Sequence, residues 1–141
     1  DVLRTGLNAG LGFSLQDRQE NLRRAACVAK ILAETGIIVL ASFITPQRDM
    51  RENAREIIGA HDWKAIFVHA DYETCARRDP KGLYARVSRG EVANFTGKDS
   101  GFEPPASDES ALTLDTEKLS VDEAAEMVWQ WGKSAHRWYP D

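Results

Sequence analysis

The 141-residue chain has no apolar run that approaches the ~20 residues of a membrane-spanning helix, and its start lacks the charged-then-apolar layout of a signal peptide. We therefore expect no membrane association and a cytoplasmic location. The sequence also has only two cysteines, Cys27 and Cys75, in no C-x-x-C or Cys/His spacing. The cysteines therefore suggest neither a zinc site nor a disulfide framework, and we expect two buried or half-buried thiols on helices.

A basic excess is missing as well, because 18 Lys and Arg stand against 22 Asp and Glu, for a net charge of −4. A broad surface for a nucleic acid polymer is therefore not expected. The apolar content of 43% against 28% charged residues is typical of a soluble globular protein. We expect residues 1–141 to form a single domain.

Helix and strand signals alternate along the chain. Ser14 begins a capping-box-like start of an amphipathic helix that Gly36 ends. The run IIVLASFI at 37–44 is typical of a strand buried on both faces of a parallel sheet. The other expected elements are strands at 64–70 and 111–114, helices at 47–58, 72–78 and 81–90, a Gly/Pro/Ser-rich lid loop at 94–110, and a closing helix whose inner stripe runs from Val121 to Trp131.

This alternation predicts an α/β fold with a parallel sheet. The phosphate-binding motif G-x-x-x-x-G-K-[ST] does not occur in the sequence. A strand–loop–helix–strand start that carries it would need about 30 further residues.

Five segments in order resemble adenylylsulfate kinases: D-V-L-R-T-G-L-N-A-G-L-G-F (1–13), D-R-Q-E-N-L-R-R (17–24), S-F-I-T-P (42–46), R-D-P-K-G-L-Y (78–84) and N-F-T-G-K-D-S (94–100). The resemblance implies a three-layer parallel sheet of the P-loop NTPase type, here lacking the N-terminal strand, P-loop and helix. Residues 1–141 would then be a partial kinase domain that holds the acceptor site, the lid and the C-terminal helix. The absent strand would lie between the strands at 37–44 and 64–70, so we expect the isolated chain to be poorly folded or self-associating.

The resemblance also implies an activity: transfer of the ATP γ-phosphoryl group to the 3′-hydroxyl of adenosine 5′-phosphosulfate, with Mg²⁺ accompanying ATP, in sulfate activation. It implies a homodimer and a fusion or association with a sulfurylase. Two alternatives stay open, namely another P-loop small-molecule kinase and a non-catalytic nucleotide-binding or regulatory remnant of the family.

Arginine and amide side chains are implied for the phosphosulfate group, at Arg4, Arg18 and Asn21. Their donors suit oxyanions. Phe13 and Phe95 match the pair of aromatic residues that sandwich the adenine. Phe95 lies in a Gly/Asn/Thr loop with little core to join, which favours a ligand contact.

A second group of matched residues surrounds the reacting atoms. Asp1 matches the carboxylate near the acceptor hydroxyl and the Mg²⁺ ion, and is a catalytic candidate. Thr45 replaces the family's usual serine, so we name it both as a catalytic candidate and, with Ile44, as pocket lining at the carboxyl end of a strand. Lys81, at the base of the lid, and Asn94, within the lid loop, are both expected to contact the substrate.

Other polar residues are expected to be structural or solvent-facing. Arg23 and Arg24 are interpreted as a solvated helix face. The three histidines, His61, His69 and His136, fall outside the resembling segments.

Overall fold

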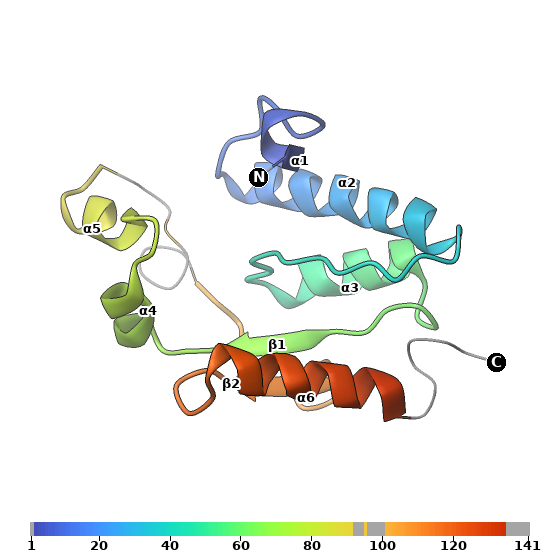
Figure 1. Ribbon diagram of the computed structural model, residues 1–141. Helices are drawn as coiled ribbons and strands as arrows, with labels where there is room; N and C mark the ends of the chain where they lie inside the picture. The colour runs from blue at the N-terminus through green and yellow to red at the C-terminus, as the bar shows by residue number, and fades with distance from the viewer. Residues whose placement is uncertain (1, 92–94, 96–100, 135–141) are drawn as a thin grey trace. The chain divides into compact units, whose positions relative to one another are not determined.

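The computed structural model describes residues 2–91, 95 and 101–134 (Figure 1). The chain divides into two compact units. Unit 1 comprises Asp1–Trp63 and Asp99–Pro104, and unit 2 comprises Lys64–Lys98 and Pro105–Asp141. Within the described residues, no helix has both the length and the apolar character that a bilayer crossing requires.

Unit 1 is helical: α1 (Val2–Thr5), α2 (Leu15–Ala33) and α3 (Arg48–Ile58). The predicted start of α2 is confirmed, since the Ser14 hydroxyl accepts the backbone N–H of Asp17 at 3.1 Å. The predicted α3 is confirmed to within a residue, after the fully buried Pro46. The single turn α1 was not predicted. Four residues are too short to carry a helical pattern.

The core of unit 1 lies between α2 and α3, which pack against each other. Small side chains dominate there: Leu22, Ala25 and Ala26 face inward from α2, and Met50 and Ala54 from α3. Alanine side chains are small and let the two helix backbones approach closely, so few large side chains are needed to fill the space between α2 and α3.

The segment at 37–44 is not a strand, and that prediction is wrong. Its backbone forms no ladder, because the one ladder among the described residues lies in unit 2. A strand needs a partner for its N–H and C=O groups, and apolar composition alone does not supply one. Large apolar side chains are consequently exposed along it: Ile37, Ile38, Leu40, Phe43 and Ile44.

Residues 101–104 are fastened to the start of α3. The Glu103 N–H donates to Pro46 O at 2.7 Å, and the Arg48 N–H donates to Glu103 Oε2 at 2.8 Å. Arg51, only 7% exposed, donates from Nη1 to both Thr45 O and Glu103 O at 3.0 Å. The middle of the predicted lid loop is thus tied to the segment around Pro46 that leads into α3.

Unit 2 contains a parallel strand pair, β1 (Ile66–His69) and β2 (Leu112–Asp115). The register pairs Ile66 with Leu112 and His69 with Asp115. These strands confirm the predictions at 64–70 and 111–114, and their parallel pairing confirms the α/β class.

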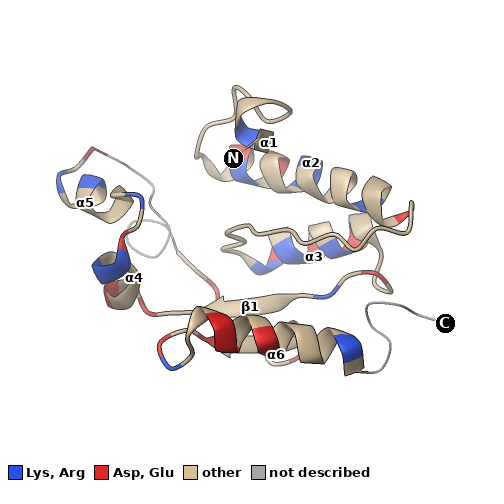
Figure 2. Ribbon diagram, in the orientation of Figure 1, with Lys and Arg blue, Asp and Glu red and all other residues tan. Residues whose placement is uncertain are grey.

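The closing helix α6 (Val121–Lys133) packs on β2 and begins with the predicted capping box of Ser120 and Glu123. Acidic residues in its first turn and Lys133 in its last complement the helix dipole (Figure 2). The predicted inner stripe is wrong at two of its positions, since Val121 is 84% exposed and Ala125 is exposed as well. The other members of the stripe are half-buried: Ala124, Val128 and Trp131.

Two short helices follow β1: α4 (Tyr72–Arg78) and α5 (Leu83–Ser88). Asp71 caps α4 by accepting the Thr74 N–H at 2.6 Å. Asp79 accepts N–H groups from the first turn of α5, and Gly82 supplies the left-handed residue (φ 65°) that lets the chain enter that helix. Both cysteines are half-buried, on α2 and α4, as predicted.

Candidate functional site

Two of the predicted arginines meet at the loop that carries Phe13, and we call Arg4, Phe13 and Arg18 the arginine–phenylalanine cluster. The Arg4 guanidinium carbon lies 4.8 Å from the centroid of the Phe13 ring, and its Nη1 donates to Leu11 O and Gly12 O at 3.0 Å. Arg18 Nε donates to Phe13 O at 3.0 Å. The structure therefore places the Arg4 guanidinium against the Phe13 ring, which is 62% exposed, and the Arg18 guanidinium at the backbone carbonyl of the same residue.

Asn21 belongs to a buried amide pair. The Nδ2 group of Asn8, which is 0% exposed, donates to Asn21 Oδ1 at 2.9 Å. This bond fixes the orientation of the Asn21 amide on α2. Sequence analysis missed Asn8, since a single asparagine in a Gly-rich turn carries no pattern that distinguishes a buried position from an exposed one.

Arg24 is not part of a solvated helix face, and that prediction is wrong. Its Nη1 donates to Leu7 O at 2.8 Å and its Nε to Glu20 Oε1 at 2.7 Å, so it ties the preceding loop to α2. Arg23 is half-exposed and pairs with Glu20, as a solvated residue would. Hydrogen bonds from Arg23 and then Arg24 lower the pKa of Glu20 to about 2.

An open hollow of about 870 Å³ lies in unit 1 between α2 and α3, and none of the predicted substrate residues lines it. Its walls carry the carboxylates of Asp17, Glu20 and Asp49 beside the guanidinium groups of Arg23 and Arg24. Charges of both signs nearly cancel there, so the hollow is poorly suited to a highly charged anion. The arginine–phenylalanine cluster is the better candidate site.

Ile44 is the last residue of the exposed segment at 37–44, and Thr45 follows it. This segment is not a strand, so the prediction that both residues lie at the carboxyl end of a strand is wrong. Ile44 is 67% exposed, whereas Thr45 is half-buried and held through its carbonyl by Arg51. The Thr45 backbone is therefore fixed from its carboxyl side.

In unit 2 the structure gives Phe95 an aromatic partner. Its ring meets Tyr84 edge-to-face with 4.9 Å between centroids, and Tyr84 meets Tyr72 in the same way at 5.3 Å. The expectation that Phe95 has little core to join is wrong. Burial, and then a hydrogen bond with Cys75, raises the pKa of Tyr84 to about 12. Phe13 and Phe95 belong to different units, so their pairing around an adenine stays a prediction.

The structure does not test the predicted roles of three further residues. Lys81 is exposed between α4 and α5. Asp1 and Asn94 lie outside the described residues, and the placement of Mg²⁺ by Asp1 therefore stays a prediction.

Sequence analysis also missed how Arg78, inside the R-D-P-K-G-L-Y segment, closes the carboxyl end of the sheet. Arg78 Nη1 donates to Thr116 Oγ1 at 3.0 Å, and that hydroxyl donates to His69 O at 2.9 Å. The carboxyl ends of parallel strands are where α/β proteins bind ligands.

Comparisons with known proteins agree on one family. The family model for adenylylsulphate kinase matches residues 1–113. The adenylyl-sulfate kinase of Bacteroides thetaiotaomicron is 49% identical over 124 residues, which are 88% of this chain and 61% of that protein. The adenylyl-sulfate kinase of Staphylococcus carnosus is 44% identical over 131 residues, covering 93% and 65% respectively.

A longer relative is the bifunctional enzyme NodQ of Rhizobium sp. (strain N33), which is 46% identical over 93% of this chain and 20% of its own length. Among solved structures, the Mycobacterium tuberculosis APS kinase CysC in complex with AMPPNP and APS superposes with a TM-score of 0.85 at 41% identity, over 95% of this chain and 77% of that one. The chain spans about three fifths of the length of the first curated relatives it matches.

Proposed function

Because the chain belongs to the adenylylsulphate kinase family, we propose that it takes part in transferring the γ-phosphoryl group of ATP to the 3′-hydroxyl of adenosine 5′-phosphosulfate. The bond between the γ-phosphorus and the β,γ-bridging oxygen breaks, a bond from the 3′-oxygen to that phosphorus forms, and the hydroxyl proton leaves. The products are ADP and 3′-phosphoadenosine 5′-phosphosulfate. The observation that carries this proposal is the arginine–phenylalanine cluster.

The cluster suits the phosphosulfate group of the acceptor. That group is a mixed anhydride with negative oxygens on phosphorus and on sulfur, and planar guanidinium forks bind such oxygens in pairs. The hydrogen bonds from Arg4 to the Leu11 and Gly12 carbonyls come from Nη1, and a guanidinium carries five N–H donors in all. Asn21, oriented by Asn8, adds an amide on the helix that carries Arg18.

The exposed ring of Phe13 suits the adenine, because any base presents a π-face and stacking is worth about 1–3 kcal/mol. The Arg4 guanidinium already holds one ring through a cation–π contact. We keep Phe95 as the proposed second stacking residue. Ile44, Thr45, Lys81 and Asn94 are kept as proposed substrate contacts.

Phosphoryl transfer depends mostly on positioning and on stabilisation of charge. We propose that Asp1 orients the 3′-hydroxyl and accepts its proton, and that the Thr45 hydroxyl lies beside the same atoms. Mg²⁺, when bound with ATP, would neutralise charge on the phosphates. Since the 141 residues hold no G-x-x-x-x-G-K-[ST] motif, we assign this chain the acceptor side of the reaction.

Relatives named adenylyl-sulfate kinase support this activity over that of another small-molecule kinase. A non-catalytic nucleotide-binding or regulatory role is the second candidate, and the relatives named as kinases do not favour it. Association with a sulfurylase and homodimer formation are further proposals. The bifunctional relative, in which this region fills a fifth of the protein, supports the fusion of such a domain to a second enzyme.

Calorimetric titration with adenosine 5′-phosphosulfate tests the site. Arg18→Ala should weaken binding by roughly ten- to 150-fold, since hydrogen bonds to charged groups are worth about 1.5–3 kcal/mol. Arg23→Ala is the matched control, because Arg23 lies on the same helix, is half-exposed, and leaves Glu20 bonded to Arg24. Equal losses in both variants would contradict the proposed site, and absence of binding to the unaltered protein would contradict the proposed function.

A further inference from the structure

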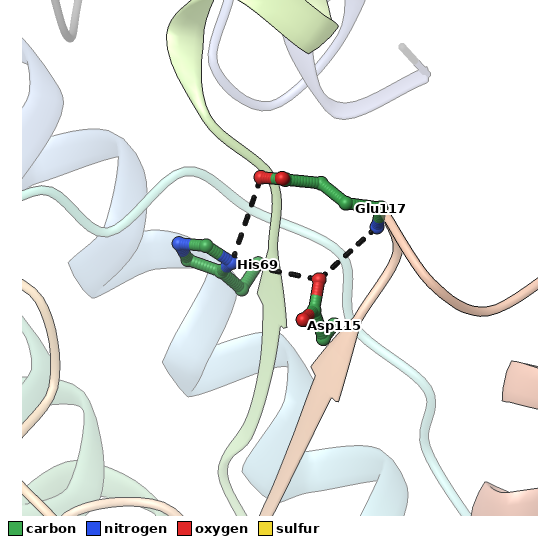
Figure 3. A group of neighbouring side chains, drawn as sticks. All are labelled: His69, Asp115 and Glu117. Carbon is green, nitrogen blue, oxygen red and sulfur yellow. Dashed lines mark hydrogen bonds and ion pairs between the residues drawn. The ribbon is translucent and has the colours of Figure 1, made fainter.

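His69, Asp115 and Glu117 gather at the carboxyl ends of β1 and β2, within unit 2 (Figure 3). The parallel register sets His69 opposite Asp115, so both side chains leave the same face of the sheet. None of the three lies in the segments that resemble the kinase family, and the proposed phosphoryl transfer uses none of them.

The three side chains converge on one point. His69 Nδ1 lies 3.9 Å from Asp115 Oδ1 and 4.0 Å from Glu117 Oε1, and one ligand atom from each residue lies within 4.8 Å of the others. A tetrahedral ion with bonds of about 2.0–2.2 Å separates its ligands by roughly 3.3–3.6 Å. Closing onto an ion would move each ligand atom by less than about 1 Å. The side chains are 33–47% exposed, which leaves room for that movement.

Backbone groups hold the two carboxylates in place. The Asp71 N–H donates to Glu117 Oε1 at 2.7 Å, and the Glu117 N–H donates to Asp115 Oδ1 at 3.1 Å. A carboxylate oxygen can accept a hydrogen bond and bind a cation together, and ligating carboxylates in proteins are commonly held in this way. The ligand set is thus oriented before any ion arrives.

The local charge favours a divalent cation. Lys118 bonds Asp115 at Oδ2, the oxygen away from His69, and its side chain is 83% exposed. Two carboxylates and one ammonium leave the cluster with one net negative charge while His69 is neutral. An imidazole with two carboxylates suits Zn²⁺ or Co²⁺, whereas Mg²⁺ prefers oxygen ligands alone.

We propose that His69, Asp115 and Glu117 bind a divalent transition metal ion such as Zn²⁺ or Co²⁺, through one imidazole nitrogen and two carboxylate oxygens. Three protein ligands leave a further position for water or another ligand. The ion would join the end of β1 to the turn that follows β2. It would therefore stabilise unit 2 by an amount that rises with the logarithm of the free ion concentration above the Kd.

Titration of the full chain tests the site, with Zn²⁺ followed by calorimetry and Co²⁺ by its visible absorption. One equivalent should bind, and a large excess of Mg²⁺ should not displace it. His69→Ala and Glu117→Gln should each weaken Co²⁺ binding by more than about tenfold, because losing a ligand costs at least as much as losing an outer-shell partner. Glu117→Gln keeps the shape of the side chain and an acceptor for Asp71, so it also serves if His69→Ala misfolds.

His61→Ala is the matched control, since it removes another exposed histidine and belongs to unit 1. It should bind both ions as the unaltered chain does. The proposal is overturned by absence of saturable binding, by displacement with Mg²⁺, or by an equal loss in the His61 and His69 variants.

Discussion

The buried amide pair of Asn8 and Asn21 permits a sharp test of how the candidate site is built. Asn8→Ala removes the amide donor that lies 2.9 Å from Asn21 Oδ1. That oxygen then loses this hydrogen bond while Asn21 stays buried, at 8% exposed. A buried acceptor that loses its partner costs about 1–3 kcal/mol. For a chain of this size, each 1 kcal/mol shifts Tm by about 3 °C, so a fall of roughly 3–10 °C is expected.

Urea unfolding followed by circular dichroism measures this cost. Asn53→Ala is the matched control, because Asn53 is exposed on α3 and its replacement should change stability by less than about 0.5 kcal/mol. Asn8→Asp keeps the shape but places a carboxylate against Asn21 Oδ1, so its deficit should shrink as the pH falls and the carboxyl regains a proton to donate. If Asn8→Ala were as stable as Asn53→Ala, the buried pair would not hold the loop to α2.

Two further predictions concern charge and stacking. The pKa of Glu20 falls on folding from its usual 4.5 to about 2, so its contribution to stability is full above pH 4.5 and is lost as the pH falls through about 2. Glu20→Gln should remove this pH dependence of the unfolding free energy. If the variant and the unaltered chain had the same pH profile, the pairing of Glu20 with Arg23 and Arg24 would be contradicted. Phe95→Leu keeps an apolar side chain but no π-face, so it should weaken calorimetric binding of adenosine 5′-phosphosulfate by about 1–3 kcal/mol and leave ATP binding unchanged. Equal losses for both nucleotides would assign Phe95 to packing alone.

Local signals predicted the helices well. The hydroxyl of Ser14 and the capping box at Ser120 each mark a helix start within a few residues, so sequence alone locates them. Strands differ, because a strand exists only with its partner. Residues 66–69 and 112–115 find one another, whereas the equally apolar 37–44 finds no ladder within the described chain.

The candidate site was predicted in composition more than in arrangement. Arg4, Phe13 and Arg18 were recognised from ordered segments, and the structure brings them together. The tie from Arg24 to the Leu7 carbonyl could not be foreseen, since backbone carbonyls have no sequence signature. The packing of Phe95 was missed for a related reason, because its partner Tyr84 lies on a separate helix.

The bonds of Arg51 make two distant stretches of the chain thermodynamically interdependent. One guanidinium nitrogen serves both Thr45 O and Glu103 O, so displacing either carbonyl weakens the hold on the other. A ligand that favours one position of Thr45 therefore also shifts the conformational equilibrium of residues 101–104. The coupling free energy is the same in both directions, so a change at residues 101–104 shifts Thr45 equally. A lysine at this position would preserve the charge but not the rigid planar fork on which this reciprocity depends.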